Sequence, residues 1–316
     1  MTIPWLSVII PCHNGERWLT ATLQSIVDQK DGGLEVILVD SSSNDLCLRI
    51  IESFRGVLKV RAIRRPDLLS WTAKTNFGAT LGRGEHICIL HQDDTWLSER
   101  SVAVRKWVSN QSNGVMYLHP CYIIDETGRR LGLWRCPLPA GCSPLPAQLL
   151  YQRLLIQNFI GIPAPTIRRD AYFKVGGLDE SLWYTADWDL YLKIAGIGPV
   201  YYHCDPLACF RVHKRSLTVV GSRNIEDFRQ QHQIIIDRHI QNIISDKRTG
   251  IKRVAETSVG VNVALASAIA GKLGGLTKAA CSVLALGPNG IRQYVFCSRI
   301  ADRVIPRLRA LITGTF

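Results

Sequence analysis

The first hundred residues alternate between short apolar runs and segments with helical spacing. The apolar runs cover residues 7–10, 34–39, 58–63 and 86–90. Between the first two, apolar side chains recur every three or four positions, at Trp18, Leu19, Leu23, Ile26 and Val27. This strand–helix alternation predicts βαβ units with parallel strands. Ligands of such sheets bind beyond the carboxyl ends of the strands, so the residues after each run are the first place to look for a site.

The pattern loosens after residue 119. Residues 136–146 are rich in proline and predict a loop, and residues 149–159 predict a helix. A strand-like segment at 162–169 is followed by a glycine turn at Gly176 and Gly177 and a short helix over 187–194. Beyond about residue 222 the spacing is helical to the end. We therefore expect one domain over residues 1–222 and a helical C-terminal extension over residues 223–316.

Composition narrows the class of protein. With 316 residues, 47% hydrophobic and 20% charged, the chain is expected to fold around a large core. Its ten cysteines are scattered without a CxxC pair, which favours a reducing, cytoplasmic compartment over a zinc or disulfide framework. The first predicted strand begins almost at once, with Leu6-Ser7-Val8-Ile9-Ile10, so no secretory signal is expected. No stretch of about twenty residues is free of charges and helix breakers, so no transmembrane helix is predicted.

The net charge of +12 is concentrated near the end of the chain. Residues 236–316 hold twelve Lys or Arg against four Asp or Glu, a net +8. Such a balance predicts an acidic partner, either nucleic acid or an anionic membrane surface. The basic residues are not interleaved with aromatic side chains at a stacking spacing, so nucleic acid is the poorer interpretation.

Polar residues follow the first two apolar runs. The first run leads into Pro11-Cys12-His13-Asn14-Gly15-Glu16, which lacks the GxGxxG pattern of dinucleotide-binding folds. The second ends in Asp40, followed by Ser41-Ser42-Ser43-Asn44-Asp45. A carboxylate at this position can accept hydrogen bonds from a ribose or a base. The same cluster can instead cap the next helix. The residues leave both interpretations open.

The fourth run is followed by His91-Gln92-Asp93-Asp94. Two adjacent carboxylates after a buried strand are costly unless a cation compensates them. Mg²⁺ or Mn²⁺ bridging a diphosphate would do so, because these ions prefer carboxylate and phosphate oxygens. The alternative is that one of the two aspartates begins a helix near Ser98.

Two later segments carry weaker signals. Asp187 and Asp189 stand two positions apart, and the aromatic residues Trp183 and Trp188 flank Asp187. This arrangement suits a general base beside a sugar-stacking surface. A helix cap among core aromatics explains the same residues. Residues 210–216 include His213 among basic side chains and suit a metal ligand with phosphate contacts, although a single histidine is more often structural.

Taken in order, these segments resemble a known family. The series SVIIPCHNGE, LVDSSSND, AKTNFGATLGRGEHICILHQDD, VGGLDESLWYTADWDLYLK and FRVHKRS is similar to the inverting family 2 glycosyltransferases of the GT-A fold, over about residues 5–220. The resemblance implies an α/β, Rossmann-like, nucleotide-sugar-binding mixed sheet flanked by helices. It also implies transfer of a sugar from a UDP- or dTDP-sugar to a hydroxyl of a glycan or lipid-linked acceptor, in polysaccharide or glycolipid synthesis.

The resemblance also implies roles for single residues. Those expected to bind the donor are Pro11, His13, Asn14, Glu16, Asp40, Asn76, Gln92 and Asp93. Those expected to hold a divalent ion, Mg²⁺ or Mn²⁺, are Asp93, Asp94 and His213. Asp187 would be the catalytic base, and Trp183 or Trp188 would stack on the acceptor sugar.

The sequence departs from the family pattern at four positions. His13 replaces a Tyr, Ser41 an Asp, His91 the first Asp of the DxD-type motif, and Ala186 a Glu. The change at His91 lowers the negative charge around the metal but keeps Asp93. It is the one support for an alternative, a catalytically silent relative that binds nucleotide-sugar or lipid. A nucleotidyltransferase on a related sheet is a further alternative, but it would need a glycine-rich basic loop after the first strand.

The last segment predicts a contact with membranes. Between residues 291 and 311, five arginines alternate with apolar side chains, and Arg299, Arg303 and Arg307 recur at every fourth position. Such a helix, which we expect Pro306 to bend or divide, can lie peripherally on the inner face of an anionic membrane. Each basic residue would contribute about 1 kcal/mol. Packing on the catalytic domain or on a second subunit is the alternative.

Overall fold

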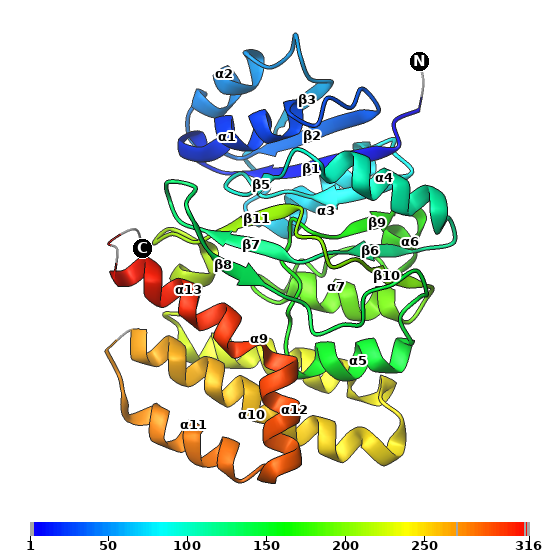
Figure 1. The fold of residues 1–316 in the computed structure, drawn as a ribbon. Helices are drawn as coiled ribbons and strands as arrows, with labels where there is room; N and C mark the ends of the chain where they lie inside the picture. The colour runs from blue at the N-terminus through cyan, green and yellow to red at the C-terminus, as the bar shows by residue number, and fades with distance from the viewer. Residues whose placement is uncertain (1–2, 270, 313, 315–316) are drawn as a thin grey trace.

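The computed structural model describes residues 3–269, 271–312 and 314. Its main sheet has seven strands in the order β10 (Val200–Tyr202), β6 (Met116–Leu118), β9 (Thr166–Arg168), β4 (His86–Ile89), β1 (Leu6–Cys12), β2 (Leu34–Asp40) and β3 (Val60–Arg64). The four N-terminal strands are parallel, as the apolar runs predict. β9 runs antiparallel to both β4 and β6, so the whole sheet is mixed (Figure 1).

Helices cover both faces of this sheet. On one face lie α1 (Glu16–Val27), α2 (Leu46–Glu52) and α4 (Arg100–Asn110), and on the other α3 (Trp71–Leu81), α6 (Arg169–Lys174) and α7 (Ala186–Ala195). Within β1, Val8 and Ile10 pack with the first group and Ile9 with the second, because successive side chains point to opposite faces. Burial on both faces explains why the sequence shows continuous apolar runs.

A second sheet lies beside the first and was not predicted. Its strand order is β5 (Thr95–Trp96), β11 (Ala208–Arg211), β7 (Cys121–Ile124) and β8 (Arg130–Trp134). β5 begins directly after Asp94 and pairs with β11, which ends at Arg211. This pairing brings residues 93–94 beside residues 211–213, more than a hundred positions later.

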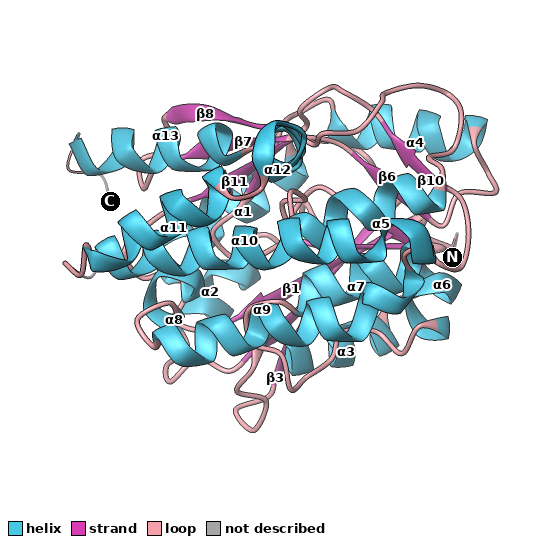
Figure 2. Ribbon diagram, turned by 90° about the horizontal axis from the view of Figure 1, so that it is seen from below, coloured by secondary structure: helices cyan, strands magenta, loops and turns pink. Residues whose placement is uncertain are grey.

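The chain after residue 222 folds into helices that pack on the sheet domain. They are α9 (Ile225–His239), a 3₁₀ turn (Ile240–Asn242), α10 (Ser245–Ile269), α11 (Gly274–Leu284), α12 (Gly287–Ser298) and α13 (Ile300–Ile312). α9 packs on α7, α10 on α5 (Ala147–Ile156), and α13 along β8 (Figures 1 and 2). The predicted domain boundary at 222/223 falls between α8 (Leu217–Gly221) and α9, and it stays a prediction. Residues 1–2 of the first predicted unit and residues 315–316 of the second lie outside the described residues.

The last helices break at a different place from the one expected. Arg299 has a left-handed backbone (φ 46°) and separates α12 from α13. α13 continues through Pro306, so this proline does not divide the helix, and the other expected effect, a bend, stays a prediction. The proline ring packs over Gly132 of β8, where a Cβ would lie 2.6 Å from its Cγ. Among the described residues, no helix has the length and apolar character needed to cross a membrane.

Candidate active site

The loops after β1 and β2 meet because the two strands end side by side, with Cys12 opposite Asp40. Asn14 has a left-handed backbone (φ 48°), a conformation that Asn tolerates better than most residues. Its backbone N–H donates to Ser42 Oγ (2.8 Å), and its side-chain Oδ1 accepts from the N–H of Ser43 (3.1 Å). The predicted donor residues His13 and Asn14 therefore lie at the carboxyl edge of the sheet, both exposed.

Asp40 is fully buried beneath these loops. Its Oδ1 accepts from the backbone N–H (3.0 Å) and the hydroxyl (2.5 Å) of Ser42, whereas its Oδ2 has no hydrogen-bond partner among the described residues. Asp40 does not cap α2, whose N-cap position is held by Asp45. Buried carboxylate oxygens normally have partners, so the free oxygen suits a ligand that donates a hydrogen bond.

Lys74 is a buried cation near Asp40 that the sequence analysis missed. It lies on α3, and its ammonium donates to Ser41 Oγ (2.8 Å), at the position where the family pattern has a second Asp. Burial lowers the pKa of the Lys74 ammonium. Because Lys occurs on most helices, no local sequence signal distinguishes this one.

Gln92 joins the loop after β4 to the loop after β1. Its Oε1 accepts from the N–H of His13 (2.8 Å), and its Nε2 donates to the carbonyl oxygen of His13 (3.1 Å). A Cβ at Gly15 would lie 2.3 Å from Gln92 Oε1, which explains the glycine. These contacts position the loop after β1, and a direct donor contact by Gln92 stays a prediction.

Two further predicted donor residues have structural surroundings. The Oδ1 of Asn76 accepts from Tyr172 Oη (2.6 Å) and the N–H of Leu178 (3.0 Å), and its Nδ2 donates to the Leu178 carbonyl and to Glu180, both at 2.9 Å. The amide thus ties α3 to the glycine turn, and nothing in its contacts supports donor binding. Pro11 is buried within β1, opposite Val39 of β2.

Glu16 begins α1 and is only partly buried. One of its carboxylate oxygens lies 4.0 Å from the Cys47 thiol. Its position at the start of a helix favours a negative charge there.

An acidic cluster follows β4. The side chains of His91, Asp93 and Asp94 each place one potential ligand atom within 4.8 Å of the others. His213 Nε2 lies 2.8 Å from Asp93 Oδ2. Neither aspartate begins a helix, because β5 intervenes and α4 begins only at Arg100.

The residues of this cluster are held in place by β11 and α1. The backbone N–H of Arg211 donates to Asp94 Oδ1 (2.9 Å), and its guanidinium Nε donates to the Asp93 carbonyl oxygen (2.7 Å). The His213 ring packs on Trp18, with ring centroids 4.1 Å apart. Two remote segments therefore fix the orientation of Asp93.

His91 was not predicted as a ligand, yet it belongs to the cluster. Burial lowers the pKa of its imidazole, so the ring is neutral at pH 7, the form that binds metals. His91 Nε2 and Asp94 Oδ2 are buried without a hydrogen-bond partner among the described residues. Carboxylates with imidazoles and free acceptor atoms fit a divalent cation.

Asp187 lies in the first turn of α7. Its Oδ1 accepts from the Trp188 N–H (2.8 Å), and its Oδ2 accepts from Asn158 Nδ2 (3.1 Å). Burial raises the pKa of Asp187 to about 7, and these two hydrogen bonds oppose the shift only in part. A carboxylate that titrates near neutral pH is suited to general-base catalysis.

Asp187 and Asp93 line the same cavity, of about 150 Å³. Trp71, Trp183 and Tyr184 also line it, together with Arg303 and Arg307 from α13. Trp183 is partly exposed and its indole N–H donates to Asp227 (2.6 Å).

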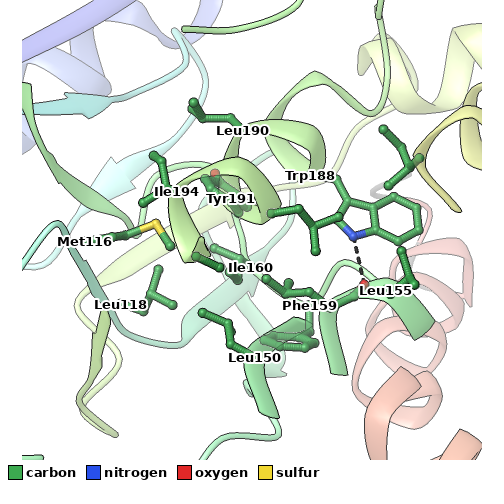
Figure 3. Packing of buried hydrophobic residues seen from close by; sticks show 14 of the residues in the cluster. Met116, Leu118, Leu150, Leu155, Phe159, Ile160, Trp188, Leu190, Tyr191 and Ile194 are labelled. Atoms are coloured by element: carbon green, nitrogen blue, oxygen red, sulfur yellow. Dashed lines mark hydrogen bonds between the residues drawn. The ribbon is translucent and has the colours of Figure 1, made fainter. Parts of the chain in front are cut away.

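Trp188 is only 2% exposed, and its indole N–H donates to the Leu154 carbonyl oxygen (2.8 Å) in the core shown in Figure 3. Although Trp188 also borders the cavity, its burial favours Trp183 of the two residues predicted to stack on an acceptor sugar.

The sequence profile of glycosyl transferase family 2 matches residues 7–176, more than half of the chain. The chain belongs to glycosyltransferase family 2. The matched residues include Asp40 and Asp93, whereas Asp187 and His213 lie beyond them. An uncharacterized glycosyltransferase from Haemophilus influenzae is 26% identical over 239 residues, covering 72% of this chain and 77% of the relative.

Solved structures show that this family 2 glycosyltransferase has the GT-A fold. Staphylococcus aureus TarS (residues 1–349) in complex with UDP-GlcNAc is similar with a TM-score of 0.67, at 17% identity, over 92% of this chain and 79% of that one. A mannosyltransferase from Pyrobaculum calidifontis in complex with GDP-Man and Mn²⁺ is similar with a TM-score of 0.56, at 16% identity, over 98% and 88% of the two chains.

Proposed function

We propose that this glycosyltransferase moves a sugar from a nucleotide-sugar donor to an acceptor hydroxyl with inversion of configuration. The observation that carries the proposal is the cavity shared by Asp187, a carboxylate with a pKa near 7, and the acidic cluster around Asp93. Asp187 is suited to take a proton from the acceptor, and the acidic cluster is suited to hold the donor diphosphate through a cation.

In the proposed reaction, Asp187 accepts the proton of the acceptor hydroxyl. The acceptor oxygen forms a bond to the anomeric carbon as the bond from that carbon to the diphosphate oxygen breaks, which inverts the configuration. The N–H groups of Trp188 and Asn158 keep the Asp187 carboxylate oriented. A divalent cation, Mg²⁺ or Mn²⁺, held by Asp93 with His91, Asp94 and His213 within reach, would supply positive charge to the departing diphosphate.

The donor is proposed to be a UDP- or dTDP-sugar. The free Oδ2 of Asp40 can accept a hydrogen bond from the imide N–H of a pyrimidine base or from a ribose hydroxyl. Structures of the neighbours contain UDP-GlcNAc and GDP-Man, which supports a nucleotide-sugar of some kind.

The acceptor is proposed to be a glycan or lipid-linked glycan, as in polysaccharide or glycolipid synthesis, with its sugar stacked on Trp183. On α13, Ile305, Leu308 and Leu311 are 46%, 50% and 47% exposed. This apolar strip supports peripheral contact with the inner face of a membrane, although Arg303 and Arg307 of the same helix face the cavity instead.

A panel of nucleotide-sugars tests the proposal. Thermal stabilisation and donor hydrolysis are measured with Mn²⁺, with Mg²⁺ and with chelator, on the wild type and on Asp93→Ala. We expect stabilisation by UDP or dTDP only with metal, and its loss in Asp93→Ala. The control Glu256→Ala changes an exposed carboxylate of α10 that does not line the cavity and should behave as wild type. Full activity in excess chelator would contradict the metal assignment, and donor binding without any turnover would favour the silent relative.

A further inference from the structure

Two arginines of the C-terminal extension line the catalytic cavity. Arg303 and Arg307 lie one turn apart on α13, and both side chains border the same cavity as Asp187 and Trp183. In sequence they belong to the arginine stripe expected to face lipid headgroups. The structure instead turns these two inward and leaves apolar side chains of α13 toward solvent.

Both guanidinium groups are held by neutral partners. Arg303 donates through Nε to the Ser298 carbonyl oxygen (3.1 Å) and through both terminal nitrogens to Asn262 Oδ1 (3.3 Å each). Arg307 donates to the Arg303 carbonyl oxygen (2.7 Å). Backbone and amide oxygens orient these side chains without neutralising their charge.

No carboxylate within the described part of the chain forms an ion pair with either arginine. The nearest acid in sequence, Asp302, pairs with Arg135 and Arg299, each at 3.2 Å. Another arginine of the extension, Arg238, does contact two aspartates at 2.9 Å. Arg303 and Arg307 instead face the cavity with neutral hydrogen-bond partners and no carboxylate partner among the described residues.

Leaving two like charges together in a confined space is unfavourable. Burial, and then the neighbouring Arg307, lower the pKa of Arg303 to about 10, so both groups remain charged at neutral pH. The cost is removed when an anion binds between them, since guanidinium groups form paired hydrogen bonds with phosphate and carboxylate.

The two arginines lie on the side of the cavity formed by the helical extension. Arg303 contacts Asn262 of α10, whereas Asp93 and His213 lie against α1 and the sheet loops, where the donor diphosphate is expected. We propose that Arg303 and Arg307 bind a phosphate or carboxylate group of the acceptor and so select an anionic acceptor. The assignment of this anion to the acceptor rests on the proposed function. The existence of an anion site does not, because it is argued from Arg303 and Arg307 alone.

Inorganic phosphate is the first probe, measured by calorimetry at low ionic strength with chelator present. The test variant is Arg303→Gln/Arg307→Gln, which keeps hydrogen-bond donors and removes both charges. The control, Lys278→Gln/Arg292→Gln, removes two exposed charges of the same extension. We expect phosphate affinity to fall about tenfold or more in the test variant and to change less than about twofold in the control. Arg307→Gln alone serves if the double variant does not fold, because the hydrogen bond it removes, to the Arg303 carbonyl oxygen, lies within its own helix.

Further measurements separate the sources of the anion. With the donor that the panel identifies, transfer is compared between a glucuronide and the matching glucoside, and between glycerol phosphate and glycerol. The variant should lose the preference for whichever anionic acceptor the wild type favours, while affinity for UDP with Mn²⁺ stays unchanged. Unchanged phosphate binding in the variant would overturn the anion site, and a parallel loss of UDP affinity would assign it to the donor instead. If no nucleotide-sugar binds yet phosphate binding still depends on these arginines, the anion site stands and the donor function fails.

Discussion

Replacing Asp187 by Asn should reduce activity and raise stability in the same protein. Asn keeps the shape of the side chain but cannot accept a proton, so turnover should fall about 10²-fold or more. The Asp187 carboxyl has a pKa of about 7 in the fold against an ordinary 3.8. Raising the pKa from 3.8 to about 7 corresponds to at most about 4 kcal/mol of destabilisation when the group is ionised. Because the side chain borders an open cavity, we expect about 1–2 kcal/mol after screening by water.

The elevated pKa of Asp187 makes the free energy of unfolding depend on pH. Between about pH 4 and 7 the folded protein holds a proton on Asp187 that the unfolded chain has lost, so stability falls as the pH rises. The loss is nearly complete about one pH unit above the folded-state pKa of about 7. Asp187→Asn does not titrate, so its excess free energy of unfolding over the wild type, measured in urea, should grow from pH 5.5 to about 8 and then level off. For the wild type, kcat/KM should rise with a midpoint near pH 7 to a plateau about one unit higher, because only the ionised carboxylate is a base.

Asp189 provides a control on the same helix with the opposite shift. It is fully buried, and Lys193, Arg238 and His239 lie within 3.0 Å of its oxygens and hold the pKa of its carboxyl well below the ordinary range. Asp189→Asn should therefore destabilise the fold at pH 8, by about 3 kcal/mol. Near-normal turnover by Asp187→Asn with intact UDP binding would refute the base assignment. A stability difference that does not change with pH would refute the reasoning about burial.

Three further changes test other parts of the site. Asn158→Ala removes a hydrogen bond to the ionised Asp187, so the midpoint of the kcat/KM profile should move up by about one pH unit without loss of UDP binding; an unmoved midpoint would contradict this positioning role. Asn76→Ala removes four hydrogen bonds and should lower the free energy of unfolding by about 2–3 kcal/mol, whereas weakened UDP binding at normal stability would restore its predicted donor role. Ile305→Ser/Leu308→Ser/Leu311→Ser should reduce sedimentation with anionic liposomes at low salt, and equal sedimentation of the triple variant would exclude this strip as the contact.

Local sequence was sufficient to place the candidate site residues that follow consecutive strands. The runs ending near residues 12, 40 and 90 predicted parallel strands, and the polar residues after them do meet at one edge of the sheet. This works because neighbouring parallel strands end at the same edge, whatever the rest of the chain does. For Asp187, local sequence left a general base and a helix cap both open, and the family motifs favoured the base.

Tertiary structure alone decided the surroundings of those residues. The pairing of β5 with β11 places Arg211 and His213 beside Asp93, and no periodicity in the sequence predicts a contact across 120 positions. The departure at His91 looked like a loss of charge, but its burial beside two aspartates gives it the neutral form of a metal ligand.

The C-terminal helix α13 shows most clearly what the sequence alone could not predict. A stripe of arginines at every fourth position defines one face of a helix, but the sequence does not state what that face meets. Here Pro306 packs over Gly132, α13 lies along β8, and Arg303 and Arg307 turn into the cavity that Asp187 also lines. Which face of an amphipathic helix is buried depends on the surface it packs against, and that surface is built by strands more than 150 residues earlier.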